Sequence, residues 1–285
     1  MSNTPARGIA LMCAAMLSLA CMDAISKHLA SDYSIPQMLA VRFVLFTLFA
    51  VLVLCRGKVV DALRTAHLGL QILRSLIICL EVAVFVLAFR YLPLADVHAI
   101  AGVAPLLVTG LAAVFLKERI NRARWFAVCG AFLGLLVILR PGTGALGTTA
   151  LIPLAGAVLW AAYQILVRLT NDDSTGTQML YMAMVGTAVM CTLTPFYWVT
   201  PDAAGWAWLI ALGVVGSLAH WLLIAALQRA PASQLQPFHY TVLVWATVLG
   251  YFVYGDLPDT WTAIGGLIIA LSGLFAWYQG RARAL

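Results

Sequence analysis

Three ionisable side chains, Asp23, Arg42 and Glu81, lie within long apolar stretches of the sequence. A charge in such surroundings is costly, so each of these residues is a candidate for a functional role. Asp23 and Arg42 are expected at a similar depth and could form an ion pair. Alternatively, Arg42 could act in gating or bind a substrate carboxylate. Glu81 has no basic residue expected at its depth, so it could bind a proton or a substrate ammonium group, or form a protonated carboxyl that is hydrogen-bonded to a neighbouring helix.

Aromatic and polar residues recur at helical spacing in other apolar stretches. Trp160, Tyr163 and Gln164 are three and four positions apart, so they share one helix face. Two further faces of this kind hold Ser217, His220 and Trp221, and Glu81 and Phe85. Such faces predict a central cavity with aromatic walls and a few polar anchors, which suits an amphipathic or aromatic solute. The alternative is ordinary aromatic packing between helices.

Two histidines within apolar stretches, His98 and His239, are candidate binding residues. His239 follows Pro237 and Phe238, and a proline inside a helix frees backbone carbonyls that favour a cavity-lining position. Pro105 and Pro237 are candidate bending points for a change of conformation. The alternatives are that the histidines are satisfied packing residues and that the prolines only kink their helices.

The composition excludes the soluble classes of protein. Of the 285 residues, 63% are hydrophobic and 10% are charged, and the mean hydropathy is +0.97. Because a soluble domain has about 45–50% apolar and about 25% charged residues, this chain lacks the polar surface of a soluble enzyme or a nucleic-acid binder. The six cysteines form no C-x-x-C pair, so we expect no metal site and no disulfide framework.

The elements that must position these residues are membrane-spanning helices. A helix needs about 20 mostly apolar residues to cross a bilayer. Ten such runs occur, near residues 7–29, 35–55, 67–90, 94–116, 122–140, 149–169, 176–198, 203–228, 232–254 and 260–279. The loops between them are short, so any chemistry must happen within the membrane or at its surfaces.

The distribution of basic residues predicts the orientation of the chain. Of the 17 lysines and arginines, 12 fall on the side that would hold both termini, and 3 fall on the opposite side. Cytoplasmic loops carry an excess of lysine and arginine. We therefore expect both termini in the cytoplasm, and the net charge of +6 reflects topology rather than a nucleic-acid partner.

The two halves of the sequence resemble each other weakly, in a consistent order. Matches at offsets of 141, 138, 138 and 136 pair residues 36–39 with 177–180, 92–95 with 230–233, His98 with Gln236, and Trp125 and Gly130 with Trp261 and Gly266. Each unit holds five spans, an odd number, so the second unit runs through the membrane upside down. Inverted repeats are typical of secondary transporters, whose substrate site lies between the halves.

A family resemblance rests on the fourth span of the first half. The segment Ala88–Asp96 (AFRYLPLAD), followed by Leu116–Arg119 (LKER), resembles the drug/metabolite transporter superfamily and, within it, the EamA-type exporters of bacteria. The second copy is degraded, with Leu227–Pro231 and Gly255–Asp256 in the matching places. The resemblance implies export of amino acids, metabolites or drugs, often coupled to an ion gradient. In overall similarity the chain looks most like the aromatic amino-acid exporters.

These observations predict an all-α polytopic membrane protein with ten transmembrane helices, arranged as two inverted five-helix repeats over residues 1–143 and 144–285. We expect a multi-pass protein of the bacterial inner membrane. We expect it to act as a secondary transporter that exports small metabolites, chiefly amino acids and among them the aromatic amino acids. Export would occur by alternating access through a central cavity.

The expected partners are the substrate, the lipid bilayer and protons as coupling ion, without nucleic acid or cofactor. Glycines in the fifth and tenth spans, among them Gly130, Gly134, Gly265 and Gly266, could pack these helices together or form a homodimer. The alternative functions are an exporter of drugs, quaternary amines or nucleotide sugars, and an intramembrane enzyme. Ser217 and His220 form no serine-protease site, because they share one helix without an oxyanion loop.

Overall fold

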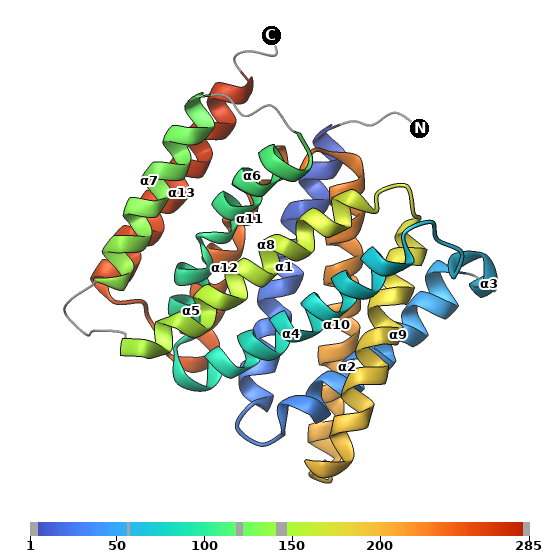
Figure 1. Cartoon of the computed structure of the whole chain (residues 1–285). Helices are drawn as coiled ribbons and strands as arrows, with labels where there is room; N and C mark the ends of the chain where they lie inside the picture. The colour runs from blue at the N-terminus through green and yellow to red at the C-terminus, as the bar shows by residue number, and fades with distance from the viewer. Residues whose placement is uncertain (1–4, 56–57, 118–121, 141–146, 282–285) are drawn as a thin grey trace.

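The computed structural model describes residues 5–55, 58–117, 122–140 and 147–281, which form helices and turns and contain no strand. The helices of the first part are α1 (Pro5–Leu29), α2 (Ile35–Phe49), α3 (Val59–Ala62), α4 (Leu68–Tyr91), α5 (Leu94–Ala101), α6 (Ala104–Phe115) and α7 (Arg122–Leu139). Those of the second part are α8 (Leu151–Leu169), α9 (Thr175–Leu193), α10 (Ala203–Arg229), α11 (Ala232–His239), α12 (Thr241–Tyr254) and α13 (Thr260–Arg281). A π-helical turn over Ala50–Leu54 extends α2 (Figure 1).

Each of the ten predicted spans coincides with one helix or with a pair of consecutive helices. Seven of the described helical segments are long and apolar enough to cross a membrane. The other three predicted spans correspond to α7, to the pair α11 and α12, and to α13. The prediction of an all-helical polytopic membrane protein is therefore confirmed. The fourth span of each half, predicted as one run, is broken into two helices.

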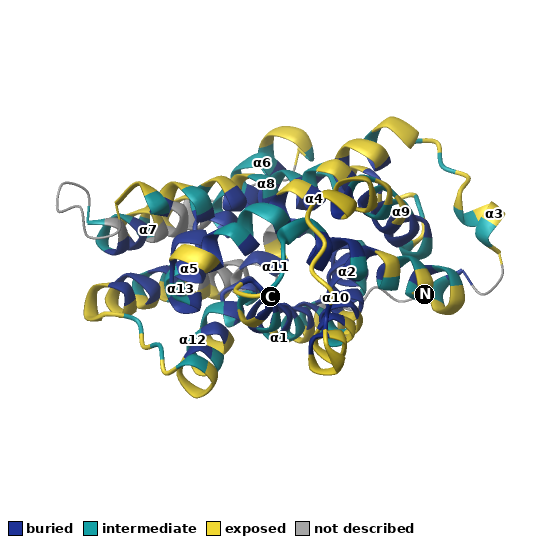
Figure 2. Cartoon of the chain, turned by 90° about the horizontal axis from the view of Figure 1, so that it is seen from below, coloured by how far each residue is buried: buried dark blue, intermediate teal, exposed yellow. Residues whose placement is uncertain are grey.

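The outer surface of the bundle is apolar, as a lipid-facing surface must be. Large hydrophobic side chains such as Leu52, Phe126 and Phe252 are more than two-thirds exposed. Figure 2 shows exposed residues on the outward sides of the helices and buried residues around the centre. The polar side chains that are candidates for a functional role therefore lie inside the bundle, where neighbouring helices replace water as their partners.

The pattern of buried and exposed residues in the first half recurs in the second half at a fixed sequence offset. Every residue from 11 to 29 has the same burial class as the residue 141 positions later, in the range 152–170. The next helices, α2 and α9, both start at a serine N-cap, Ser34 and Ser174, whose hydroxyl accepts a hydrogen bond from a backbone N–H of the first turn. The halves thus match position by position here, at offsets of 141 for α1 and α8 and 140 for α2 and α9.

Equivalent prolines separate the third span from the fourth span in both halves. Helix α4 is followed by one extended residue and then Pro93, and α10 is followed by one extended residue and then Pro231. Helices α5 and α11 start directly after these prolines. Both short helices have eight residues, and each is followed by a second helix after a break. The offset is 138 throughout, and proline explains both starts because its φ suits a first helical turn but its ring stops a preceding helix.

The contacts between helices of the two halves occur in equivalent pairs, so that each contact recurs when the two halves are interchanged. Helix α1 packs on α10, as α8 packs on α4; α2 packs on α10, as α9 packs on α4; and α1 packs on α12, as α8 packs on α6. The pairs α2–α9 and α7–α13 connect equivalent helices. In Figure 1 the start of α1 and the end of α13 lie at the same end of the molecule. The predicted boundary between residues 143 and 144 falls outside the described residues.

Helices α7 and α13 approach each other at two glycines. A Cβ atom on Gly134 would lie 2.7 Å from the carbonyl oxygen of Gly265, and one on Gly265 would lie 2.5 Å from the carbonyl oxygen of Gly134. Small residues permit such backbone approach in membranes. Of the two uses predicted for these glycines, packing of the two helices within one chain is the one that the structure shows.

We predict that Gly134→Ala lowers thermal stability in detergent, because its methyl group has no space against a backbone carbonyl. Overpacking of this kind costs about 1–3 kcal/mol. The matched control is Gly110→Ala in α6, where a Cβ would meet nothing within 4 Å. Thermal unfolding followed by fluorescence measures both variants. A Gly134→Ala variant as stable as the Gly110→Ala control would show that the contact is looser than described.

Candidate functional site

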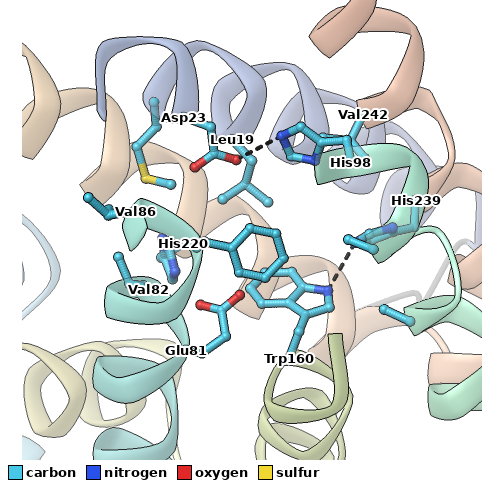
Figure 3. A pocket seen from close by; sticks show the side chains of 14 residues that line it. Leu19, Asp23, Glu81, Val82, Val86, His98, Trp160, His220, His239 and Val242 are labelled. Carbon is cyan, nitrogen blue, oxygen red and sulfur yellow. Dashed lines mark hydrogen bonds and ion pairs between the residues drawn. The ribbon is translucent and has the colours of Figure 1, made fainter. Parts of the chain in front are cut away.

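A cavity lies between the halves at the centre of the bundle. Its volume is about 50 Å³. The cavity is lined from both halves by Leu19, Met22 and Asp23 of α1, Glu81, Val82, Phe85 and Val86 of α4, His98 and Ala101 of α5, Ala104 of α6, Trp160 of α8, His220 of α10, His239 of α11 and Val242 of α12. Two carboxylates, three imidazoles and two large aromatic rings therefore share one mostly apolar space (Figure 3).

Two carboxylates enter the cavity from different helices. Oδ2 of Asp23 lies 3.3 Å from Nε2 of His98, and both side chains are largely buried. Glu81 is 6% exposed, and its carboxylate has no hydrogen-bond partner within the described part of the chain. A buried carboxylate without a partner is costly, so Glu81 is available to a ligand that carries a proton donor or a positive charge.

The broken helices bring two of the imidazoles to the cavity. His98 lies in the last turn of α5, and His239 is the last residue of α11, directly before the break. Trp160 donates its indole N–H to Nε2 of His239 over 2.9 Å. Because the indole can only donate, this bond requires an unprotonated Nε2 and holds His239 neutral. Discontinuous helices often form the binding site of transporters for this reason: the break places helix ends at the midplane.

The aromatic wall is positioned by close packing. The ring of Phe85 lies against Gly156 of α8, where a Cβ would come within 2.5 Å of a ring carbon. The same ring lies 6.4 Å from His98, centroid to centroid. On the other side, the rings of Trp160 and His220 meet edge to face at 6.5 Å. These contacts hold flat apolar surfaces beside the polar groups, which is the usual composition of a small-molecule site.

Two arginines, Arg42 and Arg74, are fully buried, and no carboxylate of the described residues lies at salt-bridge distance from them. The guanidinium of Arg42 lies 5.1 Å from the ring centroid of Phe46, and none of its nitrogens has a hydrogen-bond partner among the described residues. The charges of Asp23 and Glu81 act on it only through space. Arg74, in contrast, donates to Oε1 of Gln71 at 2.7 Å and to a backbone carbonyl of α9.

The charges of the site come from one half of the molecule. Among the described residues, every buried Asp, Glu, Lys or Arg belongs to the first half. By the offsets established above, Asp23, Arg42, Arg74, Glu81 and His98 correspond to Gln164, Met182, Leu212, Ala219 and Gln236. Each is matched by an uncharged residue. The helices are therefore duplicated in the two halves, whereas these charged and titratable side chains occur in the first half and have uncharged counterparts in the second.

The structure brings together six of the residues singled out in the sequence. The cavity is lined by Asp23, Glu81, Phe85, His98, Trp160 and His239. Asp23 and Arg42, considered as an ion pair, are not at salt-bridge distance, because Asp23 faces His98 instead. The cavity also exposes His220, which the sequence placed on a shared face with Ser217 and Trp221.

Other predicted residues lie behind the wall of the cavity. The hydroxyl of Tyr163 donates to Sδ of Met182, and Gln164 accepts a hydrogen bond from Gln236. Ser217 donates to the carbonyl of its own helix at Gly213.

Trp221 and Phe238 are partly buried and pack against the core. Pro105 stands in the first turn of α6, just after the break. The backbone of Pro237 lies in α11, but its side chain is outside the described residues.

Sequence reasoning missed the apolar part of the lining. Leu19, Val82 and Val86 have ordinary types for a membrane helix and carry no signal of their own. Their spacing does carry one, because Leu19 lies one turn before Asp23, Val82 follows Glu81 directly, and Val86 lies one turn after Val82. Residues one turn from an intramembrane carboxylate are therefore candidates for the wall that surrounds it.

A comparison with protein families identifies one family along nearly the whole chain, and similar known proteins are transporters. The sequence profile of the EamA-like transporter family matches residues 6–140 and again residues 147–278. The chain is 28% identical to a riboflavin transporter of Vibrio cholerae, over 95% of this chain and 93% of that one. It is 27% identical to an S-adenosylmethionine uptake transporter of Rickettsia felis, over 95% and 92% of the two chains.

Two further proteins are similar along nearly their whole length. The pseudopaline exporter CntI of Pseudomonas aeruginosa is 26% identical over 93% of this chain and 94% of that one. A solved crystal structure superposes with a TM-score of 0.78 at 19% identity, covering 98% of this chain and 99% of the other. At that identity the superposition shows a shared fold.

Replacing the two buried arginines by the residues at the matching positions of the second half should have opposite effects on stability. Arg42→Met removes a buried charge that has no hydrogen bond among the described residues and whose desolvation outweighs its attraction to Asp23 and Glu81, so it should leave stability unchanged or raise it. Arg74→Leu leaves the side-chain oxygen of Gln71 and the backbone carbonyl of α9 without this hydrogen-bond donor, and it should lower stability by about 1–3 kcal/mol. Thermal unfolding in detergent measures both. The same sign for the two variants would contradict the difference in their hydrogen bonding.

Proposed function

The chain belongs to the EamA-like transporter family, and on that premise we propose that it exports a small metabolite by alternating access through the central cavity. The family match extends over both halves, and transporters are similar to the chain along nearly their whole length. The family and the names of the relatives indicate a small-molecule transporter rather than an enzyme. The cavity between the halves, closed by helices from both, is the place where such a protein holds its substrate.

We propose an amino acid, aromatic ones included, as the substrate. The observation that carries this proposal is the carboxylate of Glu81, which faces the cavity beside the rings of Phe85 and Trp160 and has no hydrogen-bond partner among the described residues. A primary ammonium group would satisfy the carboxylate, and a flat side chain would contact the rings. Arg42, buried and without a hydrogen-bond partner among the described residues, partly balances the two carboxylates, which favours a zwitterion over a multiply charged cation.

A second candidate is another solute with a flat ring system, and the names of the relatives favour it. S-adenosylmethionine carries a positive charge, an amine and an aromatic base, so it matches the same carboxylates and rings; riboflavin matches the rings alone. The relatives include an uptake transporter and an exporter. The direction of transport is therefore part of the proposal, together with drugs, quaternary amines and nucleotide sugars as less favoured solutes.

The topology that we propose places both termini in the cytoplasm of a bacterium, with the protein in the inner membrane. It rests on the excess of basic residues on that side. Rocking of residues 1–143 against residues 144–285 would open the cavity alternately to each side. The breaks between α5 and α6 and between α11 and α12, near Pro105 and Pro237, are the proposed bending points.

Proteoliposomes loaded with unlabelled solute test the substrate class by counterflow, without ATP. We expect exchange of labelled tryptophan and phenylalanine. The panel includes S-adenosylmethionine, riboflavin, a quaternary amine and a nucleotide sugar, and protein-free liposomes are the control. Exchange of S-adenosylmethionine or riboflavin alone would favour the second candidate. Exchange of the quaternary amine or nucleotide sugar alone would refute both, and no exchange at all would refute the transporter proposal.

The variant Glu81→Gln should weaken binding of solutes that carry an ammonium group. Loss of a hydrogen bond to a charged group costs about 1.5–3 kcal/mol, which corresponds to roughly a 10- to 100-fold rise in the half-saturating concentration. The matched control is Asp61→Asn, an exposed carboxylate on α3. Counterflow at varied concentration provides the measurement. An unchanged half-saturating concentration would remove Glu81 from the binding site.

A further inference from the structure

We propose that a second solute site lies at the outer end of the bundle, the end that the proposed topology places outside the cytoplasm. This vestibule takes the carboxylate and the flat ring of the exported solute after the solute leaves the central cavity, so the inference rests on the transporter function proposed above and deepens it. The vestibule is an open pocket with a volume of about 540 Å³. Lys27 from α1, Phe89 and Arg90 from α4, and Tyr254 from α12 are among the residues that line it.

The vestibule continues the central cavity along two helices. Lys27 lies one turn after Asp23 on α1, and Phe89 lies one turn after Phe85 on α4, so each pair shares a helix face. Asp23 and Phe85 line the central cavity, whereas Lys27 and Phe89 line the vestibule. The two spaces therefore follow one another from the centre of the bundle toward the ends of α1 and α4.

The barrier between the two spaces is thin. The ring of Phe89 is buried, and its centroid lies 6.1 Å from the ring centroids of Phe85 and of His98, both of which line the central cavity. The hydroxyl of Tyr254 donates to the backbone carbonyl of Ala24 and thereby holds α12 against α1. A solute that leaves the cavity past the ring of Phe89 therefore enters the vestibule directly.

The two spaces differ in size by about a factor of ten. The central cavity has a volume of about 50 Å³, and the vestibule has a volume of about 540 Å³. Sites for small molecules typically measure about 300–1,000 Å³. In this conformation the vestibule is therefore large enough to hold a metabolite, whereas the central cavity has to widen before it can hold one.

The charges of the vestibule are opposite to those of the central cavity. The described lining of the vestibule contains the cations Lys27 and Arg90, with His28 as a further basic side chain, and it contains no Asp or Glu. The charged residues in the lining of the cavity are Asp23 and Glu81. The cavity therefore suits the ammonium end of a zwitterion, and the vestibule suits its carboxylate end.

Both cations are held in place and keep donors for a ligand. Arg90 is exposed and donates one N–H to the backbone carbonyl of Tyr33 at 2.9 Å. A guanidinium has five N–H donors in a planar fork that matches a carboxylate, so most of them remain available. Lys27 pairs with Asp256 at 2.6 Å, and its ammonium group has two further donors. Arg90 is therefore the main anchor for a carboxylate, and Lys27 is the second.

Two rings beside these cations supply a flat apolar surface. Phe89 and Tyr254 line the vestibule from α4 and α12, and Nζ of Lys27 lies 4.8 Å from the ring centroid of Tyr254. Aromatic side chains pack against a flat solute ring in stacked or edge-to-face arrangements. The vestibule thus combines a carboxylate anchor with an aromatic wall, and its ligand is a ring-bearing carboxylate.

The other end of the bundle shows that the charge of Arg90 is additional to its structural role. Gln228 occupies the matching position, and its amide donates to the backbone carbonyl of Asp173 at 3.0 Å, just as Arg90 donates to that of Tyr33. The offsets between these positions are 138 and 140. A neutral amide is therefore sufficient to bind the carbonyl of the loop, and the positive charge of Arg90 remains for a ligand.

The test uses two probes that carry an indole ring with one charge each. Indolepropionate has the carboxylate without the ammonium group, and tryptamine has the ammonium group without the carboxylate. Equilibrium dialysis against the purified protein in non-ionic detergent measures the dissociation constant of each probe. The variant is Arg90→Gln, which introduces the residue of the matching position. The matched control is Arg64→Gln, which removes an exposed arginine between α3 and α4.

For Arg90→Gln we expect the dissociation constant of indolepropionate to rise about 10- to 100-fold, as for the loss of a hydrogen bond to a charged group. The dissociation constant of tryptamine should stay unchanged. Glu81→Gln should have the converse effects, and Arg64→Gln should bind both probes as the wild type does. Arg90→Lys, which keeps the charge but not the planar fork, should bind indolepropionate with an intermediate dissociation constant.

Three results would overturn the inference: a wild type that does not bind indolepropionate, an Arg90→Gln variant that binds it as tightly as the wild type, and a Glu81→Gln variant that no longer binds it. In the third case the probe would occupy the central cavity. Failure of the proposed function is measured separately, by the absence of exchange in counterflow. Binding of indolepropionate requires neither transport nor Glu81, so binding that depends on Arg90 would still support a carboxylate site in the vestibule.

Discussion

The cost of placing charge among apolar helices is the constraint on which the rest of this structure depends. Water is absent from the hydrocarbon region, so each polar group must find a partner in the protein or face a cavity. Most do: Gln37 and Gln178 bond to backbone groups, and Arg74 is served by Gln71 and a carbonyl. Arg42 and Glu81 have no hydrogen-bond partner among the described residues, and Asp23 lies at ion-pair distance only from His98. The two carboxylates border one space.

That convergence follows from the way in which the two halves interlock. The first span of each half packs against the third span of the other, so α1 with Asp23 and α4 with Glu81 both border the space between the halves. The broken fourth spans then add an imidazole each, His98 at the end of α5 and His239 at the end of α11. The breaks are equivalent in the two halves, but the histidines are not at equivalent positions.

Symmetry of the fold and asymmetry of its chemistry serve different purposes. Equivalent packing allows the halves to exchange roles, which is what alternating access requires. Equivalent charges would double the number of carboxylates in the apolar cavity and of arginines buried in the bundle, at a high cost in desolvation. Uncharged residues such as Met182, Leu212 and Ala219 keep the helix contacts of the second half without that cost. The relatives show that several solutes are carried within this family, and the cavity lining is where they can differ.

The sequence alone determined the ten spans, the two-repeat organisation and the family, because hydropathy, span length and turn residues act locally. It also identified Asp23, Glu81 and His98, since a charge or an imidazole in an apolar run is conspicuous without any knowledge of its neighbours. Only the tertiary structure decided that Asp23 faces His98 rather than Arg42, that Tyr163 and Gln164 lie behind the wall while Trp160 lies in it, and that α7 and α13 pack within one chain. The physical reason is that the partner of a buried polar group is chosen by helices far apart in the chain. Depth along a helix can be read from the sequence, but rotation about its axis relative to the opposite half cannot.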